Sequence, residues 1–216
     1  MPVKAPAYKA AEPLFNWTGF YIGGTAGWGW GKTHQTDDGT FLSPPIHWDG
    51  FVGGGTLGLN WQSGRSVLGI EADISDARIK GSIPDQPAWG CGGAGTTCHN
   101  EVKWFGTVRG RAGYAMDTFL PYVTGGLAYG KLYADFNSCG TFGCITSTKT
   151  GWTAGAGFEW AFAPNWSAKV EYLYVDLGKT FSDPASLGII SGKFNVIRAG
   201  LNYRFDWSNG SVVAKY

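Results

Sequence analysis

The stretch that decides the fold lies near the end of the chain, where residues 193–205 read KFNVIRAGLNYRF. From Ile197 on, its apolar side chains share one parity and its polar side chains and glycine the other: Ile197, Ala199, Leu201, Tyr203 and Phe205 against Arg198, Gly200, Asn202 and Arg204. A period of two is typical of a β-strand, because successive side chains point to opposite faces. The stretch therefore predicts a strand with one apolar and one polar face.

The same alternation recurs in seven earlier segments. It is clear in residues 68–75, 107–112, 152–162 and 169–174, and weaker in the glycine-rich segments 18–31, 48–61 and 120–136. Tight turns are expected at 62–65, 117–118 and 164–165, and long polar loops at 32–46, 81–100, 137–148 and 180–191. Short turns at one end and long loops at the other predict an all-β, eight-stranded antiparallel up-and-down transmembrane β-barrel, with periplasmic turns and extracellular loops.

The composition fits such a barrel better than a soluble domain. The 216 residues include 35 Gly and 34 aromatic residues (11 Trp, 10 Tyr and 13 Phe), and only 15% are charged, against about 25% in soluble domains. No run of 18 apolar residues suggests a membrane helix, and no signal-peptide pattern opens the chain, so we expect any such peptide to have been removed. A net charge of +1 gives no reason to expect a nucleic-acid partner.

The chain divides into three parts on this interpretation. Residues 1–15 are predicted to be a flexible periplasmic N-terminal segment, residues 16–205 the barrel, and residues 206–216 a C-terminal periplasmic tail. Aromatic residues cluster at the expected short-turn ends of the strands, which predicts an interfacial girdle. Its expected members are Phe15, Trp17, Phe20, Trp61, Tyr114, Phe119, Tyr122, Phe162, Trp166, Tyr203 and Phe205.

Nine charged residues lie in the strands on the parity opposite the apolar side chains. They are Glu71, Asp73, Arg109, Arg111, Glu159, Lys169, Glu171, Arg198 and Arg204. An Arg or Lys facing lipid at the bilayer midplane costs about 2–4 kcal/mol, so we expect the set to converge in the lumen and plug it. Five positive and four negative charges leave +1. Nine charges are too few to cover a soluble barrel, and an eight-strand interior has little room for the aromatic face.

Several stretches resemble one family. Residues 15–24 (FNWTGFYIGG) and 199–205 (AGLNYRF), supported by 69–73, 121–130 and 170–178, are similar to alphaproteobacterial outer-membrane β-barrels, often labelled porin family or surface antigen. The resemblance implies an OmpA-like eight-strand barrel in a Gram-negative outer membrane, without shared catalytic residues. It also implies contact of the C-terminal strand with the barrel-assembly machinery. Such barrels usually end at an aromatic residue, whereas here residues 206–215 separate Phe205 from Tyr216.

Four cysteines fall in two of the expected loops. Cys91 and Cys98 enclose six residues, and Cys139 and Cys144 enclose four, so we expect two local disulfides, with pairing between the two loops as the alternative. His99 follows Cys98, which makes zinc a competing interpretation, although structural zinc sites favour closer cysteine spacing. No metal site is therefore predicted.

Two further patterns suggest chemistry less strongly. Residues 53–58 satisfy G-x-G-x-x-G, but no helix follows them, and we interpret the glycines as points of close approach. His34, His47 and His99 are expected near the long loops, where imidazoles could bind haem or metal or act as general bases. No oriented Ser-His-Asp set accompanies them.

The function expected from the sequence is structural and interfacial. We expect no enzyme activity and no cofactor, a plugged lumen, and contact with outer-membrane lipid and lipopolysaccharide. The alternatives are a narrow porin for ions or small solutes, binding of haem or another surface ligand by the long loops, and a lipid-modifying enzyme that uses the three histidines.

Overall fold

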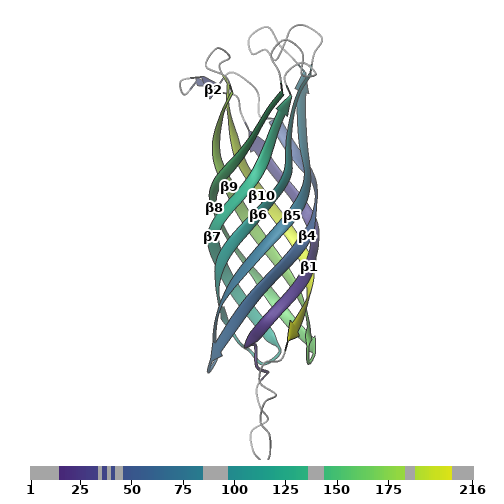
Figure 1. The fold of residues 1–216 in the computed structure, drawn as a ribbon, viewed down its shortest axis with the longest axis vertical. Helices are drawn as coiled ribbons and strands as arrows, with labels where there is room; N and C mark the ends of the chain where they lie inside the picture. The colour runs from purple at the N-terminus through teal and green to yellow at the C-terminus, as the bar shows by residue number, and fades with distance from the viewer. Residues whose placement is uncertain are drawn as a thin grey trace, which may run out of the picture.

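The computed structural model of the protein describes residues 15–33, 36–37, 40–41, 46–84, 97–135, 144–182 and 188–205. Eight long strands form a closed barrel whose strands tilt around a common axis (Figure 1). They are β1 (Gly19–Thr33), β4 (Ile46–Ser63), β5 (Ser66–Pro84), β6 (Thr97–Tyr114), β7 (Phe119–Asp135), β8 (Cys144–Ala163), β9 (Trp166–Ser182) and β10 (Gly188–Phe205). Each pairs antiparallel with the next, and β1 pairs with β10, which closes the barrel. The predicted eight-stranded antiparallel barrel is confirmed.

The turn end of the barrel matches the sequence prediction. Tight turns join β4 to β5, β6 to β7 and β8 to β9. Gly64 and Asp117 take positive φ values of 60° and 57° in the first two, a backbone region open to glycine and tolerated by Asp. The described chain ends lie at this same end: the Phe15 N–H donates to Asp117 in the β6–β7 turn, and Phe205 pairs with Phe20 at the start of β1.

The expected long loops are wrong in part, because strands occupy much of them. Strand pairing continues through Ser82 with His99 and through Tyr133 with Thr146. A further short hairpin, β2 (Thr36–Asp37) and β3 (Thr40–Phe41), lies within residues 32–46, and β2 pairs with the start of β10. Polar composition predicts a loop, yet a polar outer face is also what a strand needs once it has left the lipid.

The strands are longer than a bilayer requires. They have 15 to 20 residues, whereas about 9–11 tilted residues span the membrane. Strand β5 shows where the surroundings change. Its outward residues are apolar from Leu68 to Ile74 and then charged at Asp76, Arg78 and Lys80, while its inward residues change from charged Glu71 and Asp73 to apolar Ala77 and Ile79. Along β5 the face of each side chain follows parity, and the chemistry of the two faces exchanges where the strand leaves the membrane.

The outer surface below this change is a lipid-facing apolar band. Large apolar side chains that would be unfavourable in water are exposed here, among them Ile70, Leu127 and Val123, at 64%, 69% and 61%. Most of the predicted girdle is confirmed at the turn end, where Trp61, Phe119 and Phe162 face outward. Within the described residues, no helix has the length and hydropathy needed to cross a membrane.

Three predicted members of the girdle are wrong, because they point into the barrel. Trp17, 2% exposed, packs with Val67, Leu120 and neighbouring apolar side chains, and Phe15 packs on Trp17. The Trp17 indole N–H donates to the Asp117 carbonyl at 3.0 Å, and its backbone N–H donates to Gln62 Oε1 at 2.7 Å. Tyr122 also faces inward. Strand parity indicates the inward direction of Trp17, since Trp17 and the inward-facing Tyr21 both occupy odd-numbered positions. The start of the described chain therefore closes the periplasmic end.

Candidate functional site

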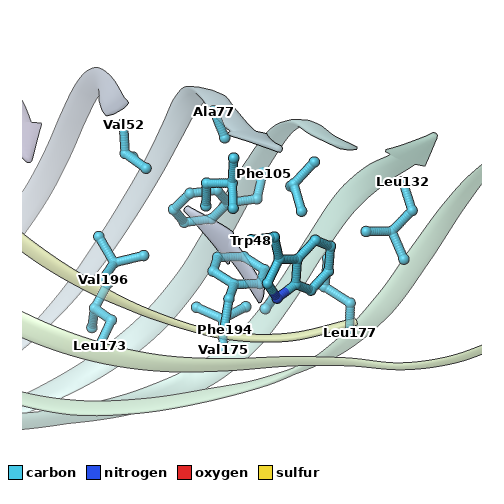
Figure 2. Close-up of a cluster of buried hydrophobic side chains, with 13 residues drawn as sticks. Trp48, Val52, Ala77, Phe105, Leu132, Leu173, Val175, Leu177, Phe194 and Val196 are labelled. Carbon is cyan, nitrogen blue, oxygen red and sulfur yellow. The ribbon is translucent and has the colours of Figure 1, made fainter. Parts of the chain in front are cut away.

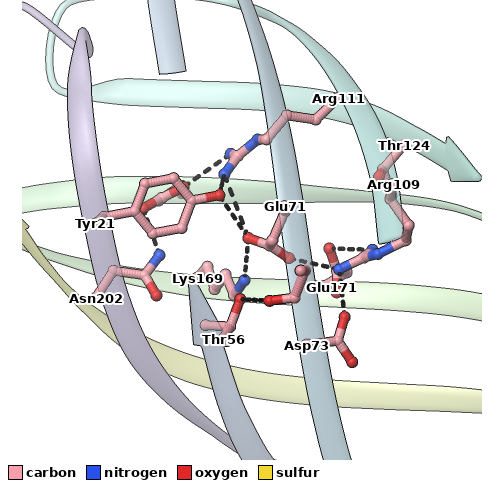
Figure 3. A network of polar contacts seen from close by, with 12 residues as sticks. Tyr21, Thr56, Glu71, Asp73, Arg109, Arg111, Thr124, Lys169, Glu171 and Asn202 are labelled. Atoms are coloured by element: carbon pink, nitrogen blue, oxygen red, sulfur yellow. Dashed lines mark hydrogen bonds and ion pairs between the residues drawn. The ribbon is translucent and has the colours of Figure 1, made fainter. Parts of the chain in front are cut away.

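The candidate site is the charged network in the middle of the lumen (Figure 3). Eight of the nine predicted charged side chains meet there, and each is at most 4% exposed. Strands β5, β6, β8, β9 and β10 supply them, each through inward-facing positions. The eight are Glu71, Asp73, Arg109, Arg111, Glu159, Lys169, Glu171 and Arg198.

Glu71 has more partner side chains than any of the other three carboxylates. Its Oε2 accepts hydrogen bonds from Lys169 Nζ and from the Tyr21 hydroxyl, both at 2.7 Å. Its Oε1 accepts a short hydrogen bond from Arg109 Nη2, and Arg111 Nη1 lies 3.7 Å from Oε2. Three cations from β6 and β9 therefore surround one carboxylate on β5. Charge-assisted hydrogen bonds of this kind are the strong ones in a dry interior.

Arg198 and Arg109 connect the remaining acids above Glu71. Arg198 reaches both oxygens of Asp73 at 3.1 Å and also donates to Glu171 Oε2 through Nε and Nη2, at 2.9 and 2.7 Å. Arg109 Nη1 donates to Glu171 Oε1 at 2.9 Å, and its Nη2 lies 3.2 Å from Asp73 Oδ2. Two guanidinium groups thus bridge two carboxylates that come from opposite sides of the barrel wall.

Glu159 forms the lower part of the network. Arg111 Nη2 donates to Glu159 Oε2 at 2.8 Å, while the Ser167 hydroxyl and the Asn202 amide donate to its Oε1. The Arg111 guanidinium also stacks over the ring of Tyr122, 4.0 Å from its centroid. Burying these charges carries a desolvation cost, which close pairing of each carboxylate with cations and neutral donors offsets.

Five neutral residues of the network were missed by sequence reasoning. They are Tyr21, Thr107, Tyr122, Ser167 and Asn202, and each donates to a carboxylate. Parity could have found them, because each occupies an inward position beside the charged ones. Two guanidinium atoms, Arg109 Nε and Arg111 Nε, have no hydrogen-bond partner among the described residues.

Arg204 is the one charged residue that the prediction misplaced. It lies at the periplasmic end, where its guanidinium contacts the Asn16 carbonyl, donates to the Pro164 carbonyl at 2.7 Å, and lies over the Phe15 ring. Its position, near the last residue of β10, is too close to the turn end for its side chain to reach the mid-lumen carboxylates. The central network therefore contains four cations and four carboxylates, 4 − 4 = 0, rather than the expected +1.

A buried apolar cluster fills the lumen above the network (Figure 2). The side chains of Trp48, Phe105 and Phe194 form edge-to-face contacts at its centre, with ring centroids 6.4 and 5.3 Å apart. Aliphatic side chains from the surrounding strands pack around them: Val52, Ala77, Ile79, Val102, Ala128, Leu132, Leu173, Val175, Leu177 and Val196. Sequence reasoning missed this cluster, although the exchange of chemistry along β5 indicates it.

Three layers therefore fill the lumen. The Trp17 cluster lies at the periplasmic end, the charged network in the middle, and the Trp48 cluster toward the long-loop end. The hollow between the lowest layer and the network has a volume of about 10 Å³, which is room for about one water molecule.

The glycine-rich stretch 53–58 lies within β4, and no helix follows it. A Cβ added to Gly58 would lie 2.4 Å from the ring of Tyr21, whereas one added to outward-facing Gly55 would meet nothing closer than 3.9 Å. Gly58 therefore leaves room for Tyr21 to reach Glu71. This supports the interpretation that the motif allows close approach.

The histidines and cysteines show no shared site in the described part of the chain. His47 on β4 and His99 on β6 line two separate hollows, of about 400 and 450 Å³. The described residues include no group of three or more His, Cys, Asp or Glu arranged to hold a metal. His34, Cys91 and Cys139, and the side chains of Cys98 and Cys144, lie outside the described residues, so the disulfides stay a prediction.

A closed antiparallel barrel with an apolar outer band, aromatic rims and buried charges inside defines an integral outer-membrane β-barrel protein. Residues 3–205 match the family described as "Outer membrane protein beta-barrel domain". The chain belongs to this family, and it is a bacterial outer-membrane protein.

Named relatives support the same assignment. A 31 kDa outer-membrane immunogenic protein of Brucella melitensis is 39% identical over 94% of this chain and 90% of its own. A 22 kDa outer membrane protein of Rhizobium leguminosarum is 32% identical, over 90% of this chain and 81% of its own. The crystal structure of the outer membrane protease OmpT from Escherichia coli aligns with a TM-score of 0.53 at 9% identity, covering 91% of this chain and 99% of that one. That likeness concerns the fold alone.

Proposed function

We propose that the protein is a structural component of the outer membrane, a sealed barrel that reinforces the envelope and presents its long-loop end at the cell surface. The observation that carries this proposal is the filling of the lumen by three successive layers, apolar, charged and apolar. An ion crossing such a lumen would have to pass through two dry clusters and displace paired charges.

The neutrality of the central network supports the same proposal. Transport pores keep polar, water-filled interiors in which charged side chains tune selectivity. Here each of the four carboxylates is satisfied by at least two donors from other strands. Four of the ion pairs also stiffen the wall, because they join strands that are not neighbours: Arg109 with Glu171, Arg111 with Glu159, Lys169 with Glu71, and Arg198 with Asp73.

The relatives support the cell-surface part of the proposal. The Brucella protein is named for being immunogenic, which fits a barrel whose long-loop end is exposed outside the cell. The strands of this chain also continue beyond the lipid-facing band, so that the loops begin at a distance from the membrane.

Removing the gene tests the structural role. We expect a deletion strain to release more outer-membrane vesicles and to become more sensitive to detergent, while its uptake of small hydrophilic solutes stays unchanged. Restoring the wild-type gene should reverse both effects. Slower solute uptake with unchanged vesicle release would instead support the narrow-porin alternative and contradict the proposal.

A further inference from the structure

The outer wall of the barrel carries its charges at one end only. Among the described side chains that face outward from the eight long strands, all charged ones lie beyond the lipid-facing band, toward the long loops. They are six cations and four acids: Lys32, Arg78, Lys80, Lys103, Lys131 and Lys193, with Asp49, Asp76, Glu101 and Asp176.

These charges are distributed unevenly around the wall. Strands β5, β6 and β7, which lie side by side (Figure 1), carry four of the cations and two of the acids, 4 − 2 = +2. The described outward side chains of the other five long strands include Lys32 and Lys193 with Asp49 and Asp176, 2 − 2 = 0. Among the described side chains, the positive surplus of the outer wall therefore belongs to the β5–β7 face.

Two irregularities in the sheet shape this face. The register shifts on both sides of Lys103, between Asp76 and Ile79 in the β5–β6 pairing and between Val102 and Trp104 in the β6–β7 pairing. A β-bulge redirects side chains and is a usual way to re-aim one residue. Here the shifts bring Arg78, Lys103 and Lys131 to similar heights on three adjacent strands, which are about 4.8 Å apart.

We call Arg78, Lys103 and Lys131 the cation row. Like charges this close together repel one another unless an anion binds between them. Arg78 has an exposed partner, Asp76, at 3.4 Å. Lys103 lies over the ring of Tyr133, 4.2 Å from its centroid, and Lys131 forms no ion pair with any described residue. The row therefore keeps capacity for an external anion.

The surroundings of the row indicate the kind of anion. Trp104 pairs with Lys131 in the sheet, and its ring packs edge to face with Tyr129 at 6.0 Å. Below this aromatic pair, Val108 and Leu127 belong to the lipid-facing band. Trp and Tyr mark the level at which acyl chains meet headgroups, so the three cations lie at headgroup height.

A hollow of about 450 Å³ lies directly above the row. Lys80, Ser82, His99, Glu101 and Tyr133 line it on the outer side of β5–β7. Its volume lies within the range of small-molecule sites, and its lining combines one aromatic ring with hydrogen-bonding groups, a combination that suits a sugar. The lipid-facing apolar band, the cation row and the polar hollow thus follow one another along the same three strands.

We propose that the β5–β7 face binds a phosphorylated glycolipid of the outer leaflet. Its acyl chains would lie on the apolar band, its phosphate groups on Arg78, Lys103 and Lys131, and its sugar in the hollow beside Tyr133. The site does not depend on whether the lumen is sealed, because every group it uses faces outward.

Native mass spectrometry of the full chain in neutral detergent micelles tests this site. The probes are diphosphoryl lipid A, the same lipid with its phosphates removed, and inorganic phosphate. We expect wild type to retain one diphosphoryl lipid A, and the variant Arg78→Gln/Lys103→Gln/Lys131→Gln to bind it roughly 100-fold more weakly, since each basic residue at a lipid surface contributes about a fivefold factor.

Matched variants separate this site from general attraction. Lys32→Gln/Lys193→Gln removes two outward cations from the other side of the wall and should leave binding unchanged, while Lys103→Arg/Lys131→Arg should retain it. Retention of heat-modifiable mobility shows that each variant folds. Equal binding of the dephosphorylated lipid, equal loss in Lys32→Gln/Lys193→Gln, or displacement of the lipid by an equal concentration of inorganic phosphate would overturn the proposal.

Discussion

Arg198 on β10 and Asp73 on β5 form a two-pronged ion pair across the lumen, with Nη1 and Nη2 each 3.1 Å from a carboxylate oxygen. Strands β4 and β1 separate these two strands in the wall. The pair therefore joins parts of the barrel that backbone hydrogen bonds do not join directly. It is also nearly inaccessible to water, with both side chains at most 1% exposed.

Replacing Arg198 by Gln should destabilise the barrel strongly. Asp73 and Glu171 would each lose a buried cationic partner, a change that typically costs about 3–5 kcal/mol. Urea unfolding in lipid vesicles would measure the loss of unfolding free energy. As a control, Lys193→Gln removes a partly exposed pair with Asp176 at 3.5 Å and should cost less than about 1 kcal/mol. Equal losses for the two variants would contradict the account of the network.

The apolar cluster above the network should behave as a protein core. Phe105 is fully buried, so Phe105→Ala should cost about 3–5 kcal/mol of unfolding free energy, and Phe105→Leu about 1.5 kcal/mol or less. Phe51 on the outer face is 50% exposed and leaves no internal cavity when shortened. A loss for Phe51→Ala as large as that for Phe105→Ala would argue against a packed cluster.

Two glycines of the same motif should respond differently to an added methyl group. Gly58→Ala places a Cβ against Tyr21, and overpacking of this kind costs about 1–3 kcal/mol. Gly55→Ala has open space and should change stability by about 0.5 kcal/mol or less. The thermal midpoint of the heat-modifiable band on gels reports both changes. Similar midpoints for the two variants would refute the role given to Gly58.

Trp17 should hold the start of the described chain inside the periplasmic end. Trp17→Ala removes a buried ring and its hydrogen bond to the Asp117 carbonyl. This should lower the unfolding free energy by about 3–5 kcal/mol. Limited proteolysis should then cleave near residue 17 faster than in wild type. Trp61→Ala removes an outward-facing ring that is 65% exposed and should leave that cleavage rate unchanged. Continued protection of residue 17 in Trp17→Ala would contradict the role given to Trp17 in closing the periplasmic end.

Much of the architecture could be predicted from strand parity. Alternation in segments such as 68–75 fixes which side chains face together, and the cost of charge in lipid fixes which face is inside. Parity does not indicate, however, where along the barrel axis a side chain lies. Arg204 has the inward parity of Arg198, yet it lies too near the turn end to join the network. Charged Arg78 and Lys80 are outward, because there the wall has left the acyl chains of the lipid.

The apolar cluster could not be predicted for a related reason. Inward residues Ala77 and Ile79 of β5 follow outward apolar residues along the same strand. Apolar residues therefore change parity within one strand, and the period of two no longer shows which face is inside. The polar segments beyond them have the composition of loops. Their strand conformation depends on pairing with distant segments, such as Ser82 with His99, which local sequence does not encode.

The conductance of the wild-type protein in planar lipid bilayers tests the central claim most directly, which is that the lumen is closed. We predict no steady current, and at most rare, small openings when the charged layer fluctuates. The control is an open porin inserted under the same conditions. A stable open state, with a conductance that rises with salt concentration, would contradict the sealed barrel and identify the protein as a narrow channel.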